Sequence, residues 1–479
     1  MRQATIIQFI SKYSSVIVQL AITMVLARHL TPDEFGTVGI VTIFTNFFIM
    51  VSDLGLGSGI IQYQELNERD ICGLFRLSFW MSVLLAALFM ALSLPATLLY
   101  KNELLIRLFI AAAPGVFFSA FNVVPDGVLL REKRFMAVGI RLVVVNALSG
   151  LVAILLALAG AGCYALVAQF SVSSALLFLW DTVASGIRIR REPMLKPLRT
   201  IFSFSIFQFA HSVVTYFSRN LDNLMIGYFF GSAPLGYYDK AYKLSNYPLI
   251  GFSSVIESVL HPYLADLQHD PDAIYQRFVE IARGVFAVGI LVSTCCMAAS
   301  EEIIALMFGD QWQAAVPLFR AISVSIMFQM VTTLTGAVFK SLGKTREMLY
   351  TTIINTGIVF LAVSGGVIAK SMLLVAVLVS AAYCLNPLAT FGILVAKGFR
   401  KPIRPFVRMF LPQLLSAVLM LDIAFALYTL LKGIALPLGP LLPLALKTAL
   451  CAAVYALLLL LTGQWRCLSF LVSKTKKEA

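Results

Sequence analysis

One stretch, Leu151–Gly160, reads Leu-Val-Ala-Ile-Leu-Leu-Ala-Leu-Ala-Gly and is apolar on every side, as is Leu84–Leu92. A helix that is hydrophobic all round must be surrounded by protein or lipid. Comparable runs of about 20 residues, the length that spans a bilayer, recur along the chain. Hydrophobic residues make up 59% of the 479 residues and charged residues only 13%, which excludes an ordinary soluble domain. A membrane β-barrel would instead show short strands in which hydrophobic and polar residues alternate. The sequence therefore predicts an all-α polytopic membrane protein.

About fourteen spans are expected from the apolar runs. They cover roughly residues 8–30, 37–61, 74–99, 104–125, 136–159, 163–186, 201–230, 235–262, 278–300, 314–339, 347–369, 372–396, 406–431 and 440–462. The first run is long and is interrupted by Lys12 and Gln19, so we expect an uncleaved first span and not a signal peptide.

The formal net charge of +13 raises the question of nucleic-acid binding, and the positions of the basic residues answer it. With the N-terminus in the cytoplasm, most of the 37 Lys and Arg fall in inside segments, and the outer loops hold only Arg28, Lys101, Arg107, Lys370 and Lys432. The positive-inside rule then predicts a multi-pass inner-membrane protein with both termini cytoplasmic and no nucleic-acid partner. The seven cysteines show no ligand spacing, so we expect no metal or cofactor.

An internal repeat appears at an offset of about 200 residues. The aligned residues are Gln8-Phe9 with Gln208-Phe209, Gly36 with Gly236, and Asn46 with Asn246. Because an even number of spans separates the copies, they are expected to be parallel repeats about an axis along the membrane normal. We predict an N-lobe of helices 1–6 at residues 1–197, a C-lobe of helices 7–12 at 198–400, and two further helices with a basic tail at 401–479.

Each repeat begins with a helix that carries a polar stripe at spacings of three and four. The stripes are Gln8, Lys12, Ser15, Gln19 and Thr23 on the first span, and Gln208, His211, Thr215, Ser218 and Asp222 on the seventh. A polar stripe on a spanning helix avoids lipid, so it faces a water-filled cavity or other helices. Interhelical hydrogen bonding remains open as the alternative.

Several short motifs, taken in order, resemble the polysaccharide transporter family of bacterial flippases. They are Leu26–Gly36 (LARHLTPDEFG), Ser52–Gly57 (SDLGLG), Leu130–Phe135 (LREKRF), Gly236–Leu244 (GYYDKAYKL), His261–Pro262, Phe308–Trp312 (FGDQW) and Ser341–Thr345 (SLGKT). The resemblance covers about residues 5–350. It implies the multidrug/oligosaccharidyl-lipid/polysaccharide exporter fold, with two lobes around a central cavity and alternating access.

The resemblance also implies a lipid diphosphate oligosaccharide as substrate, and a diphosphate calls for Lys or Arg donors. The candidate substrate-binding residues are Lys12, Arg141, Arg219, Lys240, Lys243 and Arg320, with Gln8, Gln19, Gln208 and His211. Lys12 and Arg141 could instead only snorkel to the interface, and Arg219 could be neutralised by Asp222. A cluster of Asp222, Asp239, Lys240 and Lys243 would be either a structural lock or an outer gate.

Other charged residues inside the spans have different expected roles. Depth along the last two helices predicts a structural ion pair between Asp422 and Lys447, because an unpaired charge there is costly. The candidates for coupling to a cation are Asp53, Asp222 and Glu257, with His211 as a further titratable group. Asp53 precedes Gly55, Gly57 and Gly59, which could form a bend or allow close packing.

The leading hypothesis is a flippase for an undecaprenyl-diphosphate-linked oligosaccharide, with a polysaccharide polymerase and assembly proteins as expected partners. A cation-coupled multidrug exporter and a peptidoglycan-precursor flippase share the fold and remain alternatives. The Gly343–Thr345 segment lacks the earlier glycine and the strand of a phosphate-binding loop, so a secondary transporter is expected. A membrane enzyme is disfavoured, because the short outer loops hold only Glu301, Glu302 and Asp310 as a carboxylate cluster.

Overall fold

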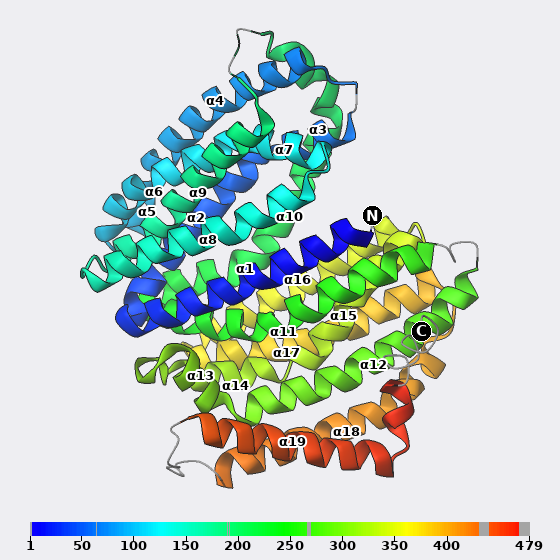
Figure 1. Ribbon diagram of the computed structural model, residues 1–479. Coiled ribbons are helices and arrows are strands. Elements are labelled where there is room, and N and C mark those ends of the chain that lie inside the picture. The colour runs from blue at the N-terminus through cyan, green and yellow to red at the C-terminus, as the bar shows by residue number, and fades with distance from the viewer. Residues whose placement is uncertain are drawn as a thin grey trace. The chain divides into compact units, whose positions relative to one another are not determined.

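The computed structural model describes residues 2–468 except 64, 189, 191, 266–269 and 431–439 (Figure 1). All regular secondary structure in this part of the chain is helical, as predicted. Contacts divide the chain into two compact units, Met1–Gly236 and Tyr237–Ala479.

The first unit holds ten helices and the start of an eleventh. They are α1 (Arg2–His29), α2 (Pro32–Asp53), α3 (Leu56–Gln62), α4 (Glu68–Ala91), α5 (Ser93–Tyr100), α6 (Leu104–Phe121), α7 (Val123–Arg131), α8 (Phe135–Leu158), α9 (Cys163–Ser185), α10 (Leu195–Phe230) and the first turn of α11 (Ser232–Ala265). Thr31 caps α2 in a capping box: the Thr31 Oγ1 accepts from the Glu34 backbone N–H, while Glu34 accepts from the Thr31 backbone N–H. Pro32 then takes the first helical position, where its missing N–H is not needed.

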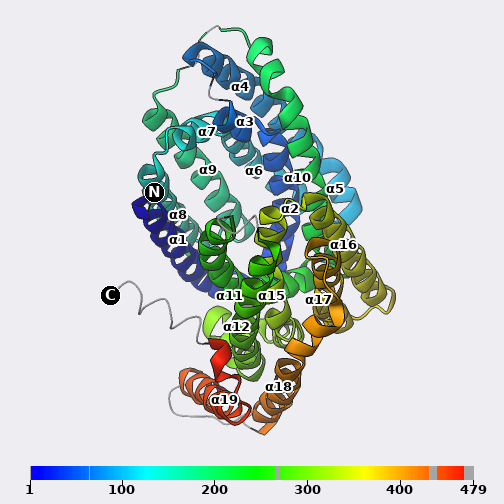
Figure 2. The same ribbon diagram turned by 90° about the vertical axis from the view of Figure 1, so that its right-hand side faces the viewer.

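The second unit holds the rest of α11 and the remaining helices. They are α12 (Pro271–Ala298), α13 (Ser300–Phe308), η1 (Asp310–Trp312), α14 (Ala315–Ser323), α15 (Ile326–Ser341), α16 (Thr345–Ile368), α17 (Met372–Ile393), η2 (Leu394–Gly398), α18 (Ile403–Leu430), α19 (Leu441–Leu461) and η3 (Gln464–Leu468). Both α18 and α19 pack along α12, and they lie side by side in Figures 1 and 2.

Ten helical stretches of the described residues are long and apolar enough to cross a membrane, and eleven if α14 and α15, bent by 53°, form one span. Three further predicted spans correspond to α1, α10 and α11, which are 28, 36 and 34 residues long and are not among those ten. The all-helical, polytopic prediction is therefore confirmed, whereas the count of about fourteen stays a prediction.

The boundary between the compact units differs from the predicted lobe boundary at residues 197 and 198. Helix α10 is grouped with the first unit because it packs on α2, α3, α4 and α5. The Tyr216 hydroxyl of α10 donates to the Ile43 carbonyl of α2, and the Tyr100 hydroxyl donates to the Leu224 carbonyl at 3.4 Å. The predicted lobes were derived from sequence similarity between the repeats, whereas the compact units are defined by contacts. The two boundaries therefore measure different things, and the predicted lobes stay a prediction.

The break between α2 and α3 answers the question posed by the glycines after Asp53. Leu54 (φ 39°) and Gly55 (φ 73°) are both left-handed, which ends α2 and turns the chain. The Asp53 Oδ1 accepts the Gly57 N–H at 3.0 Å across the break. Helix α3 packs on α7, where a Cβ on Gly127 would make an ordinary 3.4 Å contact with the Gly57 Cα. Gly55 therefore makes the bend, and Gly57 lies where α3 packs on α7.

Packing inside each unit runs from helix to helix. In the first unit α1 lies along α8, α8 along α9, and α9 along α6, which also packs on α4 (Figure 2). Stacked rings fill the space, with centroids 4.6 Å apart for Phe75–Phe121 and 4.7 Å for Phe89–Phe109. In lipid such contacts stabilise through dispersion and complementary packing, because lipid chains are as apolar as the side chains. Outward-facing residues such as Leu98 (79% exposed) and Ile368 (81%) fit a lipid-facing surface.

Candidate functional site

Charged side chains form a buried cluster in the first unit. Arg141 of α8 makes ion pairs with Asp126 of α7 and Asp181 of α9, and the Asp181 side chain is 0% exposed. The Asn122 Nδ2 donates to the Asp181 Oδ2 at 2.8 Å, at the junction of α6 and α7. One guanidinium thus joins three helices through two carboxylates.

This geometry makes Arg141 a weaker candidate for binding a diphosphate. Its guanidinium is neutralised by two carboxylates, and its side chain is only 9% exposed. A bound diphosphate would have to displace those carboxylates inside a low-dielectric cluster, which is costly. Arg141 is therefore held by two carboxylates inside the cluster, which makes it less suited to bind a diphosphate.

The polar residues of the α1 stripe differ in how deeply they are buried. Ser15 is 8% exposed and accepts from the Asn146 Nδ2 of α8 at 2.6 Å, so this position follows the interhelical alternative. Gln19 is half-buried, and its backbone carbonyl accepts from the Thr23 hydroxyl at 2.8 Å. The side chains of Gln8 and Lys12 lie outside the described part of the structure.

The polar residues of α10 differ strongly in exposure. Asp222 is 5% exposed and its Oδ1 accepts the Asn223 N–H at 2.8 Å, whereas Arg219 is exposed. The Asn220 Nδ2 donates to the Tyr216 carbonyl at 2.9 Å. Because Asp222 is buried and Arg219 is exposed, the two do not share one environment. The side chains of Gln208 and His211 on α10, and of Glu257 on α11, lie outside the described residues.

The two lysines of helix α11 differ strongly in exposure. The Lys243 Nζ lies 2.8 Å from the Asp239 Oδ2 one turn away, and the Lys243 side chain is 56% exposed. Lys240 is 5% exposed, and its Nζ lies 5.8 Å from the Phe308 ring centroid, within the range of a cation–π contact. Lys243 is therefore accessible, and Lys240 packs against the segment Phe308–Trp312 that the sequence singled out.

A second charged cluster, which we call the hairpin cluster, joins α13 and α14 to α18 and α19 in the second unit. It consists of Ser300, Glu301, Glu302, Arg320, Tyr428 and Lys447. The Arg320 Cζ lies 3.3 Å from the Tyr428 ring centroid, and the Arg320 Nε lies 3.3 Å from the Ser300 Oγ. The Tyr428 hydroxyl donates to the Glu301 Oε1 at 2.7 Å. Arg320 is thus held against α18 and is a structural contact.

The predicted ion pair between Asp422 and Lys447 is wrong. Lys447 is 0% exposed and its Nζ lies 2.5 Å from the Glu302 Oε1 of α13, whereas Asp422 is exposed. The prediction compared depths along the two helices and ignored direction around the axis. Asp422 lies two residues from both Met420 and Ala424, which are fully buried, so it points away from their face of α18.

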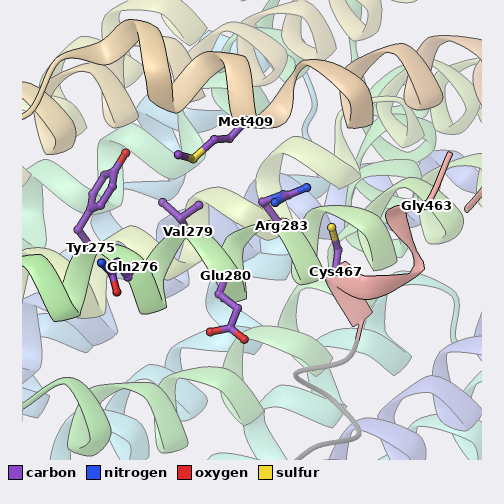
Figure 3. Close-up of a pocket in the computed structure, with 8 residues that line it drawn as sticks. All are labelled: Tyr275, Gln276, Val279, Glu280, Arg283, Met409, Gly463 and Cys467. Atoms are coloured by element: carbon purple, nitrogen blue, oxygen red, sulfur yellow. The ribbon is translucent and has the colours of Figure 1, made fainter.

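A pocket of about 430 Å³ opens in the second unit between α12, α18 and η3 (Figure 3). Its lining includes Gln276, Arg283, Met409 and Cys467. The Arg283 Nε is buried and has no hydrogen-bond partner among the described residues. Glu280, on the same helix, points away from Arg283 in Figure 3. Its Oε2 lies 2.9 Å from the Arg277 Nη1. Sequence reasoning did not single out Arg283.

Paired charges buried between long apolar helices define the class as a polytopic helical membrane protein. Comparison of folds agrees. A solved structure titled "Lipid II flippase MurJ, inward closed conformation" has a TM-score of 0.73 at 14% identity over 94% of this chain and 98% of that chain. An inward-facing multidrug resistance MATE family transporter of the MOP superfamily has a TM-score of 0.56 at 18% identity, over 82% of this chain and 95% of that one. These likenesses establish the fold.

The family follows from the sequence match. A family model described as "Polysaccharide biosynthesis protein" matches residues 25–317, which is more than half of the chain, so the chain belongs to that family.

Three curated relatives are similar over much of the chain. Teichuronic acid biosynthesis protein TuaB of Bacillus subtilis is 24% identical over 71% of each chain. Lipopolysaccharide biosynthesis protein WzxC of Escherichia coli is 23% identical, as is succinoglycan biosynthesis transport protein ExoT of Rhizobium meliloti. Each of the last two matches covers 63% of this chain and 61% of the relative, so the chain spans less than two thirds of their length.

Proposed function

We propose that this protein is a flippase for an undecaprenyl-diphosphate-linked oligosaccharide repeat unit. It moves the unit from the cytoplasmic to the periplasmic leaflet by alternating access, for export of a surface polysaccharide. Family membership supports this, and so do relatives named for three different glycans, teichuronic acid, lipopolysaccharide and succinoglycan. A multidrug exporter and a peptidoglycan-precursor flippase share the fold, but the family match favours the glycan.

The observation that carries the proposal is the exposure of Arg219 and Lys243. Arg219 is exposed on α10, and the Lys243 side chain is 56% exposed on α11. At about 1.5 Å per residue, each lies about 17 Å from the end of its helix at the α10–α11 turn, which is well inside a bilayer. A charged side chain at that depth is too costly to place in lipid, so it faces water. A cation in a water-filled path through a membrane protein fits an anionic diphosphate.

The other basic candidates are less suited to that contact. Arg141 is neutralised by two carboxylates, Arg320 lies against the Tyr428 ring, and Lys240 is buried beside Phe308. Lys243 retains Asp239 as a partner at 2.8 Å, so a diphosphate would compete with a single, partly exposed carboxylate. We therefore assign a role in diphosphate binding to Arg219 and, independently, to Lys243.

The proposal includes a topology and partners. Both termini lie in the cytoplasm and the protein resides in the bacterial inner membrane, so the α1–α2 and α10–α11 turns lie at the periplasmic face. A polysaccharide polymerase and assembly proteins act on the product, and the protein itself performs no covalent step. Asp53, Asp222 and Glu257 remain the candidates for coupling to a cation gradient.

Replacing Arg219 or Lys243 with glutamine is expected to slow translocation at least about tenfold, because a charge-assisted hydrogen bond contributes about 1.5–3 kcal/mol and 1.4 kcal/mol is a factor of ten. The measurement uses purified protein in liposomes containing a polyprenyl-diphosphate oligosaccharide, whose glycan is removed by an external glycosidase only after it reaches the outer leaflet.

Two controls make this result specific. Arg107→Gln changes an exposed cation on α6 that lies close to the α5–α6 turn, and it should leave the rate unchanged. Lys243→Arg keeps the charge and should keep most of the activity. Wild-type rates for Arg219→Gln and Lys243→Gln at equal protein level would remove both residues from the binding site. Absence of any protein-dependent translocation would contradict the proposed function itself.

A further inference from the structure

The pocket between α12, α18 and η3 has a cation in its wall whose charge the described residues do not neutralise (Figure 3). The Arg283 Nε is buried without a hydrogen-bond partner, and the described part of the chain gives the Arg283 side chain no ion pair. Glu280, the carboxylate of the lining, points away from Arg283 and pairs with Arg277 instead. A half-buried cation without a counter-charge is costly, so the pocket suits a ligand that brings negative charge.

The walls of the pocket change from polar to apolar at the level of Arg283. Helix α12 carries three charged residues before Arg283 and none after it, up to its C-terminal end. On α18 the pocket residue Met409 directly follows Arg408, and no charged residue occurs between Arg408 and Asp422. In η3, Trp465 is 52% exposed, as expected for an aromatic ring at a membrane surface. The pocket therefore lies where lipid headgroups meet hydrocarbon.

Two buried amide side chains hold these walls together. Gln413 of α18 is 0% exposed, and its Nε2 donates to the Arg283 carbonyl of α12 at 2.9 Å. Gln464 of η3 is 6% exposed, and its Nε2 donates to the Pro412 carbonyl at 3.2 Å and lies 3.1 Å from the Ser416 Oγ. The pocket is therefore pre-formed, and its volume of about 430 Å³ is in the range of small-ligand sites.

We propose that this pocket binds the headgroup of an acidic phospholipid, with the phosphate against Arg283. A guanidinium presents a planar fork of donors that matches two oxygens of a phosphate. Gln276 lines the pocket two turns before Arg283 and offers an amide to headgroup hydroxyls. A zwitterionic lipid fits less well, because Glu280 is held by Arg277 and leaves no free carboxylate in the lining for an ammonium group.

The acyl chains of such a lipid have an apolar surface to follow from the pocket. Met409 is 41% exposed, and Leu411 and Leu415, further along α18, are 51% and 65% exposed. Basic pockets between spanning helices at the cytoplasmic face are typical sites for anionic lipid headgroups. The inference uses the proposed topology only to name that face, and it does not depend on the transported substrate.

The pocket contains its own reporter, because Cys467 lines it and is half-buried. The test protein keeps Cys467, has the other six cysteines replaced by alanine, and is purified in a neutral detergent. Dioleoylphosphatidylglycerol should slow maleimide labelling of Cys467 severalfold, whereas dioleoylphosphatidylcholine should leave the rate unchanged. Equal effects of the two lipids would contradict the proposal, and this comparison needs no substitution at Arg283.

Substitutions then test the contact with the phosphate. Arg283→Gln should weaken protection by phosphatidylglycerol about tenfold, because it removes a charge-assisted hydrogen bond. Arg283→Lys keeps the charge but not the fork, so its affinity should lie between those of the parent and Arg283→Gln. The matched control is Arg346→Gln, which changes an exposed cation on α16 outside the pocket and should bind like the parent. Equal losses for Arg283→Gln and Arg346→Gln would mean that overall surface charge attracts the lipid, and the site would be wrong.

Two further additions identify the source of the phosphate. Inorganic phosphate should not protect Cys467, and protection equal to that by phosphatidylglycerol would replace the lipid with a free ion. Undecaprenyl phosphate should protect no better than phosphatidylglycerol at equal concentration. Protection by undecaprenyl phosphate alone would make the pocket part of the transport path and would end the proposal. No translocation is measured, so a failure of the proposed flippase function would leave these results unchanged.

Discussion

Lys447→Met is expected to destabilise the protein by about 3–5 kcal/mol, because it leaves the Glu302 carboxylate buried without its cation. Lys447 is 0% exposed, and its Nζ lies 2.5 Å from the Glu302 Oε1, while the Glu302 Oε2 has no hydrogen-bond partner among the described residues. The other cation of the hairpin cluster, Arg320, is already held by the Tyr428 ring and the Ser300 hydroxyl. Unfolding by SDS titration in mixed micelles measures the change in free energy.

Two companion variants test the assignment of the pair. Asp422→Asn changes an exposed carboxylate and should shift stability by less than about 0.5 kcal/mol. The double variant Glu302→Gln with Lys447→Met removes both charges, and it should recover more than half of the loss, as a double-mutant cycle reports for a coupled pair. If Asp422→Asn were as damaging as Lys447→Met, the observed partner would be wrong.

Arg141→Met is expected to have an effect at least as large, about 3–5 kcal/mol or more, because two carboxylates lose one cation together. Asp181 is fully buried, and its Oδ1 has no hydrogen-bond partner in the described part of the chain. The variant should unfold at lower SDS and should lose protein yield in membranes. Adding Asp181→Asn to Arg141→Met should restore part of the stability, since the neutral amide needs no cation.

The matched control for this variant is Arg134→Gln. Arg134 also pairs with a carboxylate, with its Nε 2.8 Å from the Glu132 Oε2, but these side chains are 51% and 41% exposed. Exposed pairs contribute about 0–1 kcal/mol, so this change should be nearly silent. Similar losses for Arg134→Gln and Arg141→Met would mean that burial does not set the strength of these contacts.

The helices could be predicted because a long hydrophobic run indicates by itself that the segment lies in lipid or in the protein interior. Each predicted span overlaps a helix or a helix with a short break, since backbone groups in lipid have no alternative to internal hydrogen bonds. The family was also within reach, since its motifs are short but ordered. These features depend on residues close together in the chain.

The partners of buried charges were harder to predict, because they depend on direction around each helix. Asp422 and Lys447 lie at similar depths, but their side chains point in different directions around their helices. The sequence also predicted an outer loop at Glu302, whereas the structure places this residue on α13, where it pairs with Lys447. The Arg141 cluster could have been found by the same depth argument, because Asp181 is a carboxylate within a predicted span near the same end as Arg141. Asp126, at the end of its span, gave no such signal. Repeat alignment paired Gly36 with Gly236, but only coordinates place them in contact.

The hairpin of α18 and α19 has a consequence for how this architecture varies among relatives. Its Tyr428 and Lys447 satisfy the two carboxylates of α13, so the hairpin and those carboxylates are chemically interdependent. A twelve-helix version of the molecule could not keep Glu302 facing hydrocarbon. Loss of the last two helices during evolution should therefore be accompanied by a neutral residue at position 302, and a chain that regains such helices should acquire the acid and the amine together.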